Sequence, residues 1–314
     1  MIMDKIIIGT RGSKLALWQA NYVKNEIENR YKSIKVELKI IKTKGDKILD
    51  VPLAMVGGKG LFVKEIEEAL LREEIDLAVH SMKDVPTFFP EGLCLPIITK
   101  REDYRDAFIS KNGKKLNDMP EKSVIGTSSL RRKSQLMNIR KDFKIKDLRG
   151  NVDTRLRKLE EGQFDGIILA VAGLRRMGFE DKITQYLDES IMIPAIGQGA
   201  LGIEIRENDN KILEIVSFLK DEKTFIEVSA ERAFLKELEG GCQVPIGCYG
   251  KINGNKLILV GFVADVEGKS FIKEDISGEI KDFEKLGVEL ANNILSKGGK
   301  EILEKVYKGE QCSP

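Results

Sequence analysis

The stretch SVIGTSSLRRKSQLMNIRKDFKIKDLRGNVDTRLRKLEEGQFDGIILAV (Ser123–Val171) decides the fold class. Three short runs, at residues 123–127, 144–150 and 164–171, are strand-like, and two amphipathic runs with helical spacing separate them. Strands that alternate with helices in this way predict a parallel sheet covered by helices on both faces. The stretch therefore indicates an α/β fold.

The first hundred residues repeat this alternation. Helical spacing follows Ser13, a capping residue, and returns over residues 61–74, after a long glycine-containing loop at residues 44–60. The strand-like runs are Lys5–Thr10, Ile34–Thr43 and Ile75–Ser81. Two such blocks predict two similar lobes, joined near Thr99–Arg105, and the chain crosses back near Pro194–Asn208.

The last third changes character. A long helical stretch over residues 221–241 precedes three strand-like runs and two terminal helices, which indicates a small α+β domain. We therefore predict three domains: residues 1–99 plus 200–218 for lobe 1, 100–199 for lobe 2, and 219–314 for the C-terminal domain.

Composition limits the classes of function. The 314 residues carry 52 Lys and Arg against 50 Asp and Glu, a net charge of +2, which argues against a general nucleic-acid binder. No apolar run is long enough to span a membrane, and no signal peptide is visible at the start of the chain. Four cysteines are too few for a disulfide scaffold, so we expect a reduced cytoplasmic protein. With no sustained heptad pattern, we expect a monomer.

Arginine recurs at four predicted strand–helix junctions, usually beside small or hydroxyl residues such as Ser13, Thr127 and Ser129. A cation at the positive end of a helix dipole costs stability unless an anion arrives. Arginine suits carboxylates and phosphates, and neither a Walker loop nor an early GxGxxG is present, so we predict a substrate with several carboxylates. The arginines are Arg11, Arg131, Arg132, Arg149, Arg155, Arg175 and Arg176.

The stretch VHSMKDVP (Val79–Pro86) places Ser81, Lys83 and Asp84 at the end of a predicted strand. Among the arginines, Asp84 should stay ionised and could stabilise a developing positive charge. The alternative is an ordinary surface pair of Lys83 and Asp84. His80, the single histidine, excludes multi-histidine metal sites, and we expect it to be a hydrogen-bonded residue at the strand end. We predict no metal site.

The stretch GGCQVPIG (Gly240–Gly247) places Cys242 on a turn after a helix. Its spacing to Cys248 is not that of a zinc site, and the negative end of a helix raises the pKa of a thiol, which disfavours a turnover nucleophile. A structural cysteine and a site of covalent attachment both remain open.

Five motifs in the same order resemble the porphobilinogen deaminase, or hydroxymethylbilane synthase, family: VHSMKDVP, IGTSSLRR, DLRGNVDTR, PAIGQGALGIE and LEGGCQVPIG. The resemblance implies a transferase of tetrapyrrole and haem biosynthesis that joins four porphobilinogen molecules, with loss of ammonia, into hydroxymethylbilane. It also implies two type II periplasmic-binding-protein-like lobes. A dipyrromethane cofactor would be thioether-linked to Cys242.

The resemblance implies a role for each matching position. Asp84 would be the catalytic aspartate, and the loop over residues 44–60, with Lys59 and the following Phe62, would act as a lid. Cofactor-binding residues would be Ser81, Lys83, Asp84, Thr127, Ser129, Arg131, Arg132, Arg155 and Cys242. Substrate-binding residues would be Arg11, Ser13, Arg149, Arg155 and Arg176.

Four positions depart from the family pattern: Gly12, Lys14, Asp153 and Cys248. Asp153 adds an acid near Arg155, and Cys248 adds a second thiol close to the attachment motif. Two other functions remain open from the residues. They are a non-catalytic two-lobed anion receptor and a thiol-dependent acyltransferase, and the scarcity of histidine counts against the second.

Overall fold

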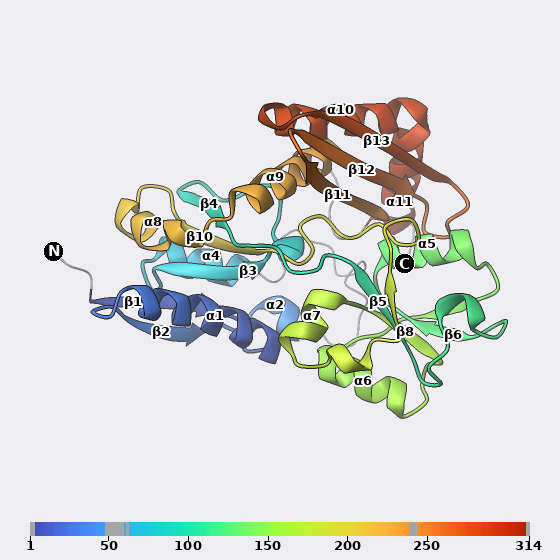
Figure 1. Ribbon diagram of the computed structural model, residues 1–314, viewed down its shortest axis with the longest axis horizontal. Coiled ribbons are helices and arrows are strands. Elements are labelled where there is room, and N and C mark those ends of the chain that lie inside the picture. Colours follow the sequence, from blue (N-terminus) through green and yellow to red (C-terminus); the bar gives the residue numbers. More distant parts are fainter. Residues whose placement is uncertain (1–3, 48–59, 61–62, 239–243, 312–314) are drawn as a thin grey trace. The chain divides into compact units, whose positions relative to one another are not determined.

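The computed structural model describes residues 4–47, 60, 63–238 and 244–311 (Figure 1). These residues form two compact units. Of the described residues, unit 1 contains those up to 102 together with 200–225, and unit 2 contains 103–199 and those from 226 onward. Within the described ranges, no helix is long and apolar enough to cross a membrane.

Unit 1 is built on a five-stranded sheet with the order β2-β1-β3-β10-β4. The strands β1, β2 and β3 are parallel, β10 runs against them, and β4 runs against β10, so four strands share one direction. The strands are β1 (Lys5–Thr10), β2 (Lys35–Ile40), β3 (Leu77–Ser81), β4 (Leu93–Ile98) and β10 (Leu201–Arg206).

Helices cover both faces of this sheet. On one face, α1 and α8 bury residues such as Val23 and Val216 against Ile8, and on the other α4 buries Ile66 and Leu70. The helices are α1 (Lys14–Arg30), α2 (Lys44–Lys47), α4 (Lys64–Leu71) and α8 (Asn210–Val216). The short helix α2 occupies the first four residues of the predicted 44–60 loop, so the chain there is helical where a loop was expected.

Unit 2 contains a second sheet with the corresponding order β7-β6-β8-β5-β9. Three parallel strands are again followed by one reversed strand and then by a fifth that reverses once more. The strands are β5 (Asp106–Ser110), β6 (Val124–Gly126), β7 (Lys144–Lys146), β8 (Gly166–Ala170) and β9 (Gln185–Leu187), with helices α5 (Leu130–Ile139), α6 (Val152–Glu160) and α7 (Val171–Arg176). This repeated topology confirms the expected pair of type II periplasmic-binding-protein-like α/β lobes.

The third sheet, also in unit 2, is antiparallel with the order β11-β12-β13. Phe234 of α9 and Leu290 of α10 pack with Leu259 in the core on one face of this sheet. The elements are α9 (Glu222–Glu237), β11 (Ile246–Asn253), β12 (Lys256–Ala264), β13 (Phe271–Glu279), α10 (Phe283–Ile294) and α11 (Lys300–Gln311). The predicted α+β character is confirmed, whereas the boundary at residue 219 stays a prediction.

Short 3-10 turns complete the described chain, and one of them, η1 (Met82–Asp84), directly follows β3. The others are η2 (Leu116–Asp118), η3 (Glu180–Lys182), η4 (Ser217–Leu219) and η5 (Ile280–Asp282), with a π-helical turn at η6 (Leu295–Gly299).

The strand expected over residues 144–150 is shorter in the structure. It ends at Lys146, because the backbone of Leu148 bonds to the Ser128 hydroxyl instead of to a strand: its N–H donates to Ser128 Oγ, and its carbonyl accepts from the same atom, both at 3.0 Å. Gly150 then takes a φ of 113°, a left-handed conformation that favours glycine.

Candidate active site

A small cavity of about 70 Å³ in unit 1 brings together four of the predicted residues: Arg11, Ser13, Ser81 and Asp84. The parallel strands β1 and β3 are neighbours, so their carboxyl ends, Thr10 and Ser81, meet at one edge of the sheet. Ligands of open parallel sheets bind at this edge. The cavity is therefore a candidate active site.

The turn that carries Asp84 is held by its neighbours. Met82 is 1% exposed, and its N–H donates to the carbonyl of Ala200 at 3.0 Å. Gln19 Nε2 donates to Ser81 Oγ at 2.8 Å. The Asp84 carboxylate, in contrast, is exposed. A buried anchor thus fixes an exposed carboxylate, while Lys83 lies beside it, half-buried and not in the cavity lining.

Ser13 is also the N-cap of α1, where its hydroxyl accepts from Ala16 N at 3.3 Å. Arg11 precedes this cap and is half-buried. The helix begins here because the side-chain oxygen satisfies a backbone donor of the first turn. The same cap fixes the loop that carries Arg11 to the cavity.

Unit 2 gathers a second group of predicted residues where β6 leads into α5. Ser129 is the N-cap of α5, and Thr127 is buried just before it. Arg131 and Arg132 are 5% and 6% exposed, and both bind Asp106, which is fully buried at the start of β5. The bonds join Arg131 Nη1 to Oδ2 at 2.8 Å and Arg132 Nη2 to Oδ1 at 2.7 Å.

Asp106 is a residue that the sequence interpretation missed. Burial alone would raise the pKa of this carboxyl, but the charges of Arg131 and Arg132 lower it well below its ordinary value. The anion expected for these two arginines is therefore supplied within the fold. The only sequence signal was one acid at the start of an otherwise apolar run, DAFIS.

The two guanidinium groups differ in what they have left to donate. Arg132 uses all three nitrogens, since Nε also bonds Asp106 and Nη1 bonds the carbonyl of Ile168. Arg131 uses only Nη1, toward Asp106 and the carbonyl of Ile193. Within the described part of the chain, Nε and Nη2 of Arg131 are the donors that this pair retains.

Arg149 and Arg155 lie at the start of α6, as expected. Arg155 is in the first turn, and its Nε donates to the carbonyl of Gly150 at 2.7 Å. Asp153 also lies in this turn, where an acid is favoured by the helix dipole. These two arginines are half-buried, so each has one side against the fold and one side accessible.

Arg175 and Arg176 do not lie at a helix start. They occupy the last turn of α7, where the helix dipole favours cations, so the predicted electrostatic cost does not exist there. The short helix directly follows β8, and this brings its C-terminal end to the junction. Arg176 Nη2 donates to the carbonyl of Gly199 at 2.6 Å.

The cysteine motif is described only from Val244 onward, so Cys242, like Lys59 and Phe62, lies outside the described residues. The strand that comes after the motif is tightly packed. A Cβ on Gly247 would meet the carbonyl oxygens of Pro194 and Ile193 at 2.9 and 3.1 Å. Cys248 is fully buried in the core of the third sheet.

Glu231 of α9, another residue that the sequence interpretation missed, binds two backbone segments, one of them in β11. Its two carboxylate oxygens accept from Gly197 N at 2.7 Å and Gly250 N at 2.8 Å, and the side chain is fully buried. The carboxylate thereby joins the segment after β9 to strand β11. Nothing in the periodicity of α9 distinguishes it from the other acids of that helix.

His80 is confirmed as a hydrogen-bonded residue at the strand end. Its Nε2 lies 2.8 Å from Oε2 of Glu204, and both side chains are buried. Glu67 of α4 is buried near them. Desolvation, together with the charge of Glu204, raises the pKa of Glu67 to about 7.

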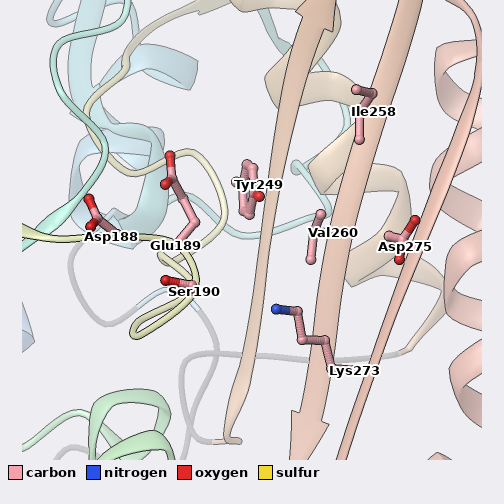
Figure 2. Close-up of a pocket in the computed structure, with 8 residues that line it drawn as sticks. All are labelled: Asp188, Glu189, Ser190, Tyr249, Ile258, Val260, Lys273 and Asp275. Atoms are coloured by element: carbon pink, nitrogen blue, oxygen red, sulfur yellow. The ribbon is translucent and has the colours of Figure 1, made fainter.

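A larger cavity, about 400 Å³, lies elsewhere in unit 2 (Figure 2). Glu189 and Ser190, which follow β9, face Tyr249 of β11 across it, and Lys273 of β13 lies on the sheet side. Tyr104 donates to Glu189 at 2.6 Å and stacks on Tyr249. None of the predicted site residues lines this cavity, so we place the candidate site in the smaller one.

The buried ion pairs of Asp106 predict a large loss of stability in Asp106→Asn. The substitution leaves two buried guanidinium groups without a counter-charge, and we expect the free energy of unfolding to fall by about 3–5 kcal/mol. Urea unfolding followed by circular dichroism measures it. Asp142→Asn, which removes the surface partner of Arg140, is the control and should lose far less. Equal losses would contradict the structural role of Asp106.

The raised pKa of Glu67 predicts a pH-dependent effect of Glu67→Gln. The folded state holds this proton up to about pH 7, whereas the unfolded chain releases it near 4.5, so wild-type stability falls between these values. The neutral variant avoids this loss. Its melting temperature should rise relative to wild type from pH 5 to pH 8, and Glu68→Gln on the same helix is the control. A constant difference across this range would count against a buried acid.

Comparisons with known proteins agree with this geometry. The chain matches the family description "Porphobilinogen deaminase, dipyromethane cofactor binding domain" over residues 6–214 and "Porphobilinogen deaminase, C-terminal domain" over residues 225–296. A porphobilinogen deaminase of Geobacter sulfurreducens is 57% identical over 99% of this chain and 97% of the relative. One of Trichlorobacter lovleyi is 58% identical over 99% of both chains.

Among solved structures, the BenM effector binding domain with its effector benzoate covers 71% of this chain and 98% of its own, at 16% identity and a TM-score of 0.40. The sequence matches span almost the whole chain. This chain belongs to the porphobilinogen deaminase family.

Proposed function

We propose that this chain is a transferase of tetrapyrrole biosynthesis, on the route to haem. It joins four porphobilinogen molecules head to tail, with release of ammonia, to give hydroxymethylbilane. The observation that carries the proposal is the match to both domains of one enzyme family. The pocket in which Asp84 lies with Arg11, Ser13 and Ser81 supports it.

The arginines provide for the carboxylates of the substrate. Porphobilinogen carries an acetate and a propionate, so a growing chain presents many carboxylates, and guanidinium groups bind these in a bidentate manner. We assign substrate binding to Arg11, Ser13, Arg149, Arg155 and Arg176. We assign binding of the primer to Ser81, Lys83, Asp84, Thr127, Ser129, Arg131 and Arg155, and a positioning role at this site to Arg132.

Asp84 is assigned the catalytic role. When ammonia leaves, positive charge develops on the carbon that carried it, and a fixed carboxylate close to that carbon stabilises the charge. The turn η1 presents Asp84 toward the cavity, and the buried Met82 keeps the turn in place. The carboxylate is thus oriented before the charge appears, which lowers the reorganisation needed in the transition state.

The chain's residues fit a dipyrromethane primer. When bound, the primer supplies the pyrrole carbon to which the first porphobilinogen is joined. The donor set, arginines with hydroxyl groups, suits its carboxylates. Gly247 packs so closely on the carbonyls of Ile193 and Pro194 that there is no room for a Cβ. This packing holds the start of β11, the strand after the attachment motif, in place.

We assign the attachment to Cys242 and not to Cys248. Cys248 lies within β11, fully buried in the same core as Leu259 and Phe234, where no bulky group could be joined to its sulfur. The burial of one thiol therefore favours the other, glycine-flanked residue.

Arg131 and Arg132 have different roles in this proposal. Arg132, with every nitrogen engaged inside the fold, acts as a positioning residue for Asp106 and α5. Arg131 retains Nε and Nη2 for a carboxylate of the primer.

We keep Lys59 and Phe62 as residues of a proposed lid. We also propose a cytoplasmic monomer that binds neither nucleic acid nor membrane, which the balanced charge supports.

Mass spectrometry of the intact protein tests the attachment. We expect the wild-type mass to exceed the sequence mass by two linked pyrrole units and Cys242→Ala to lack this addition. Cys248→Ala is the matched control, because it removes a nearby thiol that the fold buries, and it should keep the addition. An unmodified mass in active wild type would refute the proposal.

Turnover of porphobilinogen tests Asp84. In Asp84→Asn the shape is kept and the charge is lost, so we expect kcat to fall by about 10²–10³-fold, as for the loss of one preorganised electrostatic group. The intact mass should still show the primer. Near-normal kcat in a variant that carries the primer would remove Asp84 from the catalytic role.

A further inference from the structure

Three buried ionisable side chains of unit 1, one of which lines the Asp84 cavity, have no part in the proposed function so far. They are Glu67 of α4, His80 of β3 and Glu204 of β10, at 8%, 6% and 1% exposed. We call them the Glu67–His80–Glu204 cluster. His80 belongs to it and also lines the cavity with Asp84 and Arg11, so the cluster is continuous with the candidate active site.

The sheet brings His80 and Glu204 together. The strands β3 and β10 are antiparallel, with His80 opposite Gly202 and Glu204 opposite Ala78, so both side chains project from the same face. Ala78 packs there with Ile66 and Leu70, which shows that α4 covers this face. His80 Nε2 lies 2.8 Å from Oε2 of Glu204.

The cluster is short of hydrogen-bond partners. Oε1 of Glu204 is buried and has no partner among the residues that the structure describes. A buried carboxylate oxygen without a donor is costly. Glu67 is buried close enough for the charge of Glu204 to act on it, and desolvation together with that charge raises the pKa of Glu67 to about 7.

Other charged groups of unit 1 surround the cluster without balancing it. His80 is the single imidazole beside two buried carboxyl groups, so with a neutral ring the cluster carries one negative charge when Glu67 holds its proton and Glu204 is ionised. The neighbouring titratable groups are Lys64 and Glu68 on α4, Cys94 on β4 and Glu207 beyond β10, with Arg11 and Asp84 on the cavity side.

We propose that the Glu67–His80–Glu204 cluster receives the proton that the attacking pyrrole carbon loses at each condensation. The inference rests on the proposed function. In each cycle the carbon–nitrogen bond breaks, and its electron pair leaves with ammonia. The pyrrole α-carbon then forms the new carbon–carbon bond. The electron pair of its carbon–hydrogen bond returns to the ring, and the proton is left over.

The ring of His80 connects the cavity with the carboxylates. Imidazole can accept a proton at one nitrogen while it gives up the proton on the other, here Nε2, to Glu204. The gain changes the charge of the cluster from minus one to zero. Glu67, the least buried of the three, then releases a proton to water, which restores the negative charge of the cluster before the next cycle.

The single histidine makes the cluster directly observable. In protein labelled with ¹⁵N-histidine and freed of any affinity tag, all imidazole signals come from His80. We expect these signals to follow an ionisation near pH 7 in wild type, because the nearby carboxyl of Glu67 changes charge. In Glu67→Gln this transition should disappear. Glu68→Gln, which changes the neighbouring acid on the same helix, should retain it.

Steady-state kinetics then compares wild type, Glu67→Gln and Glu68→Gln. This comparison requires that the wild type produce hydroxymethylbilane. For Glu67→Gln at pH 8 we expect kcat to fall at least about tenfold with KM within about twofold, since a proton acceptor in the chemical step is lost. A carboxyl that only supported the fold would leave the pH profile of kcat unchanged.

Each outcome decides one question. An inactive wild type that carries no primer overturns the proposed function, whatever the histidine signals show. An active wild type with no His80 transition, or the same transition and the same kcat profile in Glu67→Gln, overturns the proton-accepting role. Melting curves of all three proteins confirm that the variants are folded over the pH range used.

Discussion

The buried carboxylate of Asp106 is the interaction on which unit 2 depends. It joins the start of β5 to Arg131 and Arg132 in the first turn of α5. Arg131 continues to the carbonyl of Ile193, and the segment Ile193–Pro194 packs directly on Gly247. One carboxylate thereby links the lobe to the strand that comes after the cysteine motif. Its desolvation is offset only because two cations and Gln198 surround it.

Buried acids have two opposite uses in this chain. Asp106 is fully satisfied, and its pKa falls well below the ordinary value despite its burial, so it stays charged and fixes structure. Glu204 bonds His80, and the pKa of the nearby Glu67 rises toward neutrality because it is buried close to the charge of Glu204. The arrangement around Asp106 keeps its carboxylate ionised at all physiological pH values. The arrangement around Glu67 and Glu204 can gain or lose a proton at little cost, which suits chemistry rather than stability.

The sequence predicts the fold well because periodicity reports burial directly. The alternation of strands and helices, the repeated block and the three final strands are all confirmed by the topology. Arg11, Ser13, Ser81 and Asp84 meet as expected, since each follows or ends one of two adjacent parallel strands. Local rules suffice for these residues because the parallel pairing of β1 and β3 brings the ends of the two strands together.

The missed residues share one property: their partners are distant in sequence. Asp106 lies 25 residues from Arg131, and Glu204 lies 124 residues from His80. No local pattern reveals such pairs, because each acid occupies an otherwise ordinary strand or, like Glu231, an ordinary helix. The end of α7 illustrates the opposite failure, where a correct dipole rule was applied to Arg175 and Arg176 at the wrong end of the helix.

These two cases change how the arginine-rich junctions should be interpreted. A guanidinium at a helix start does not by itself indicate a ligand, since an internal acid such as Asp106 can supply the missing negative charge. The informative quantity is the set of donors that remains after the internal bonds are made. By that measure Arg132 is committed to the fold, whereas Arg131 still has two nitrogens to offer. The position of an arginine suggests an anion, and its unused donors indicate whether that anion comes from outside.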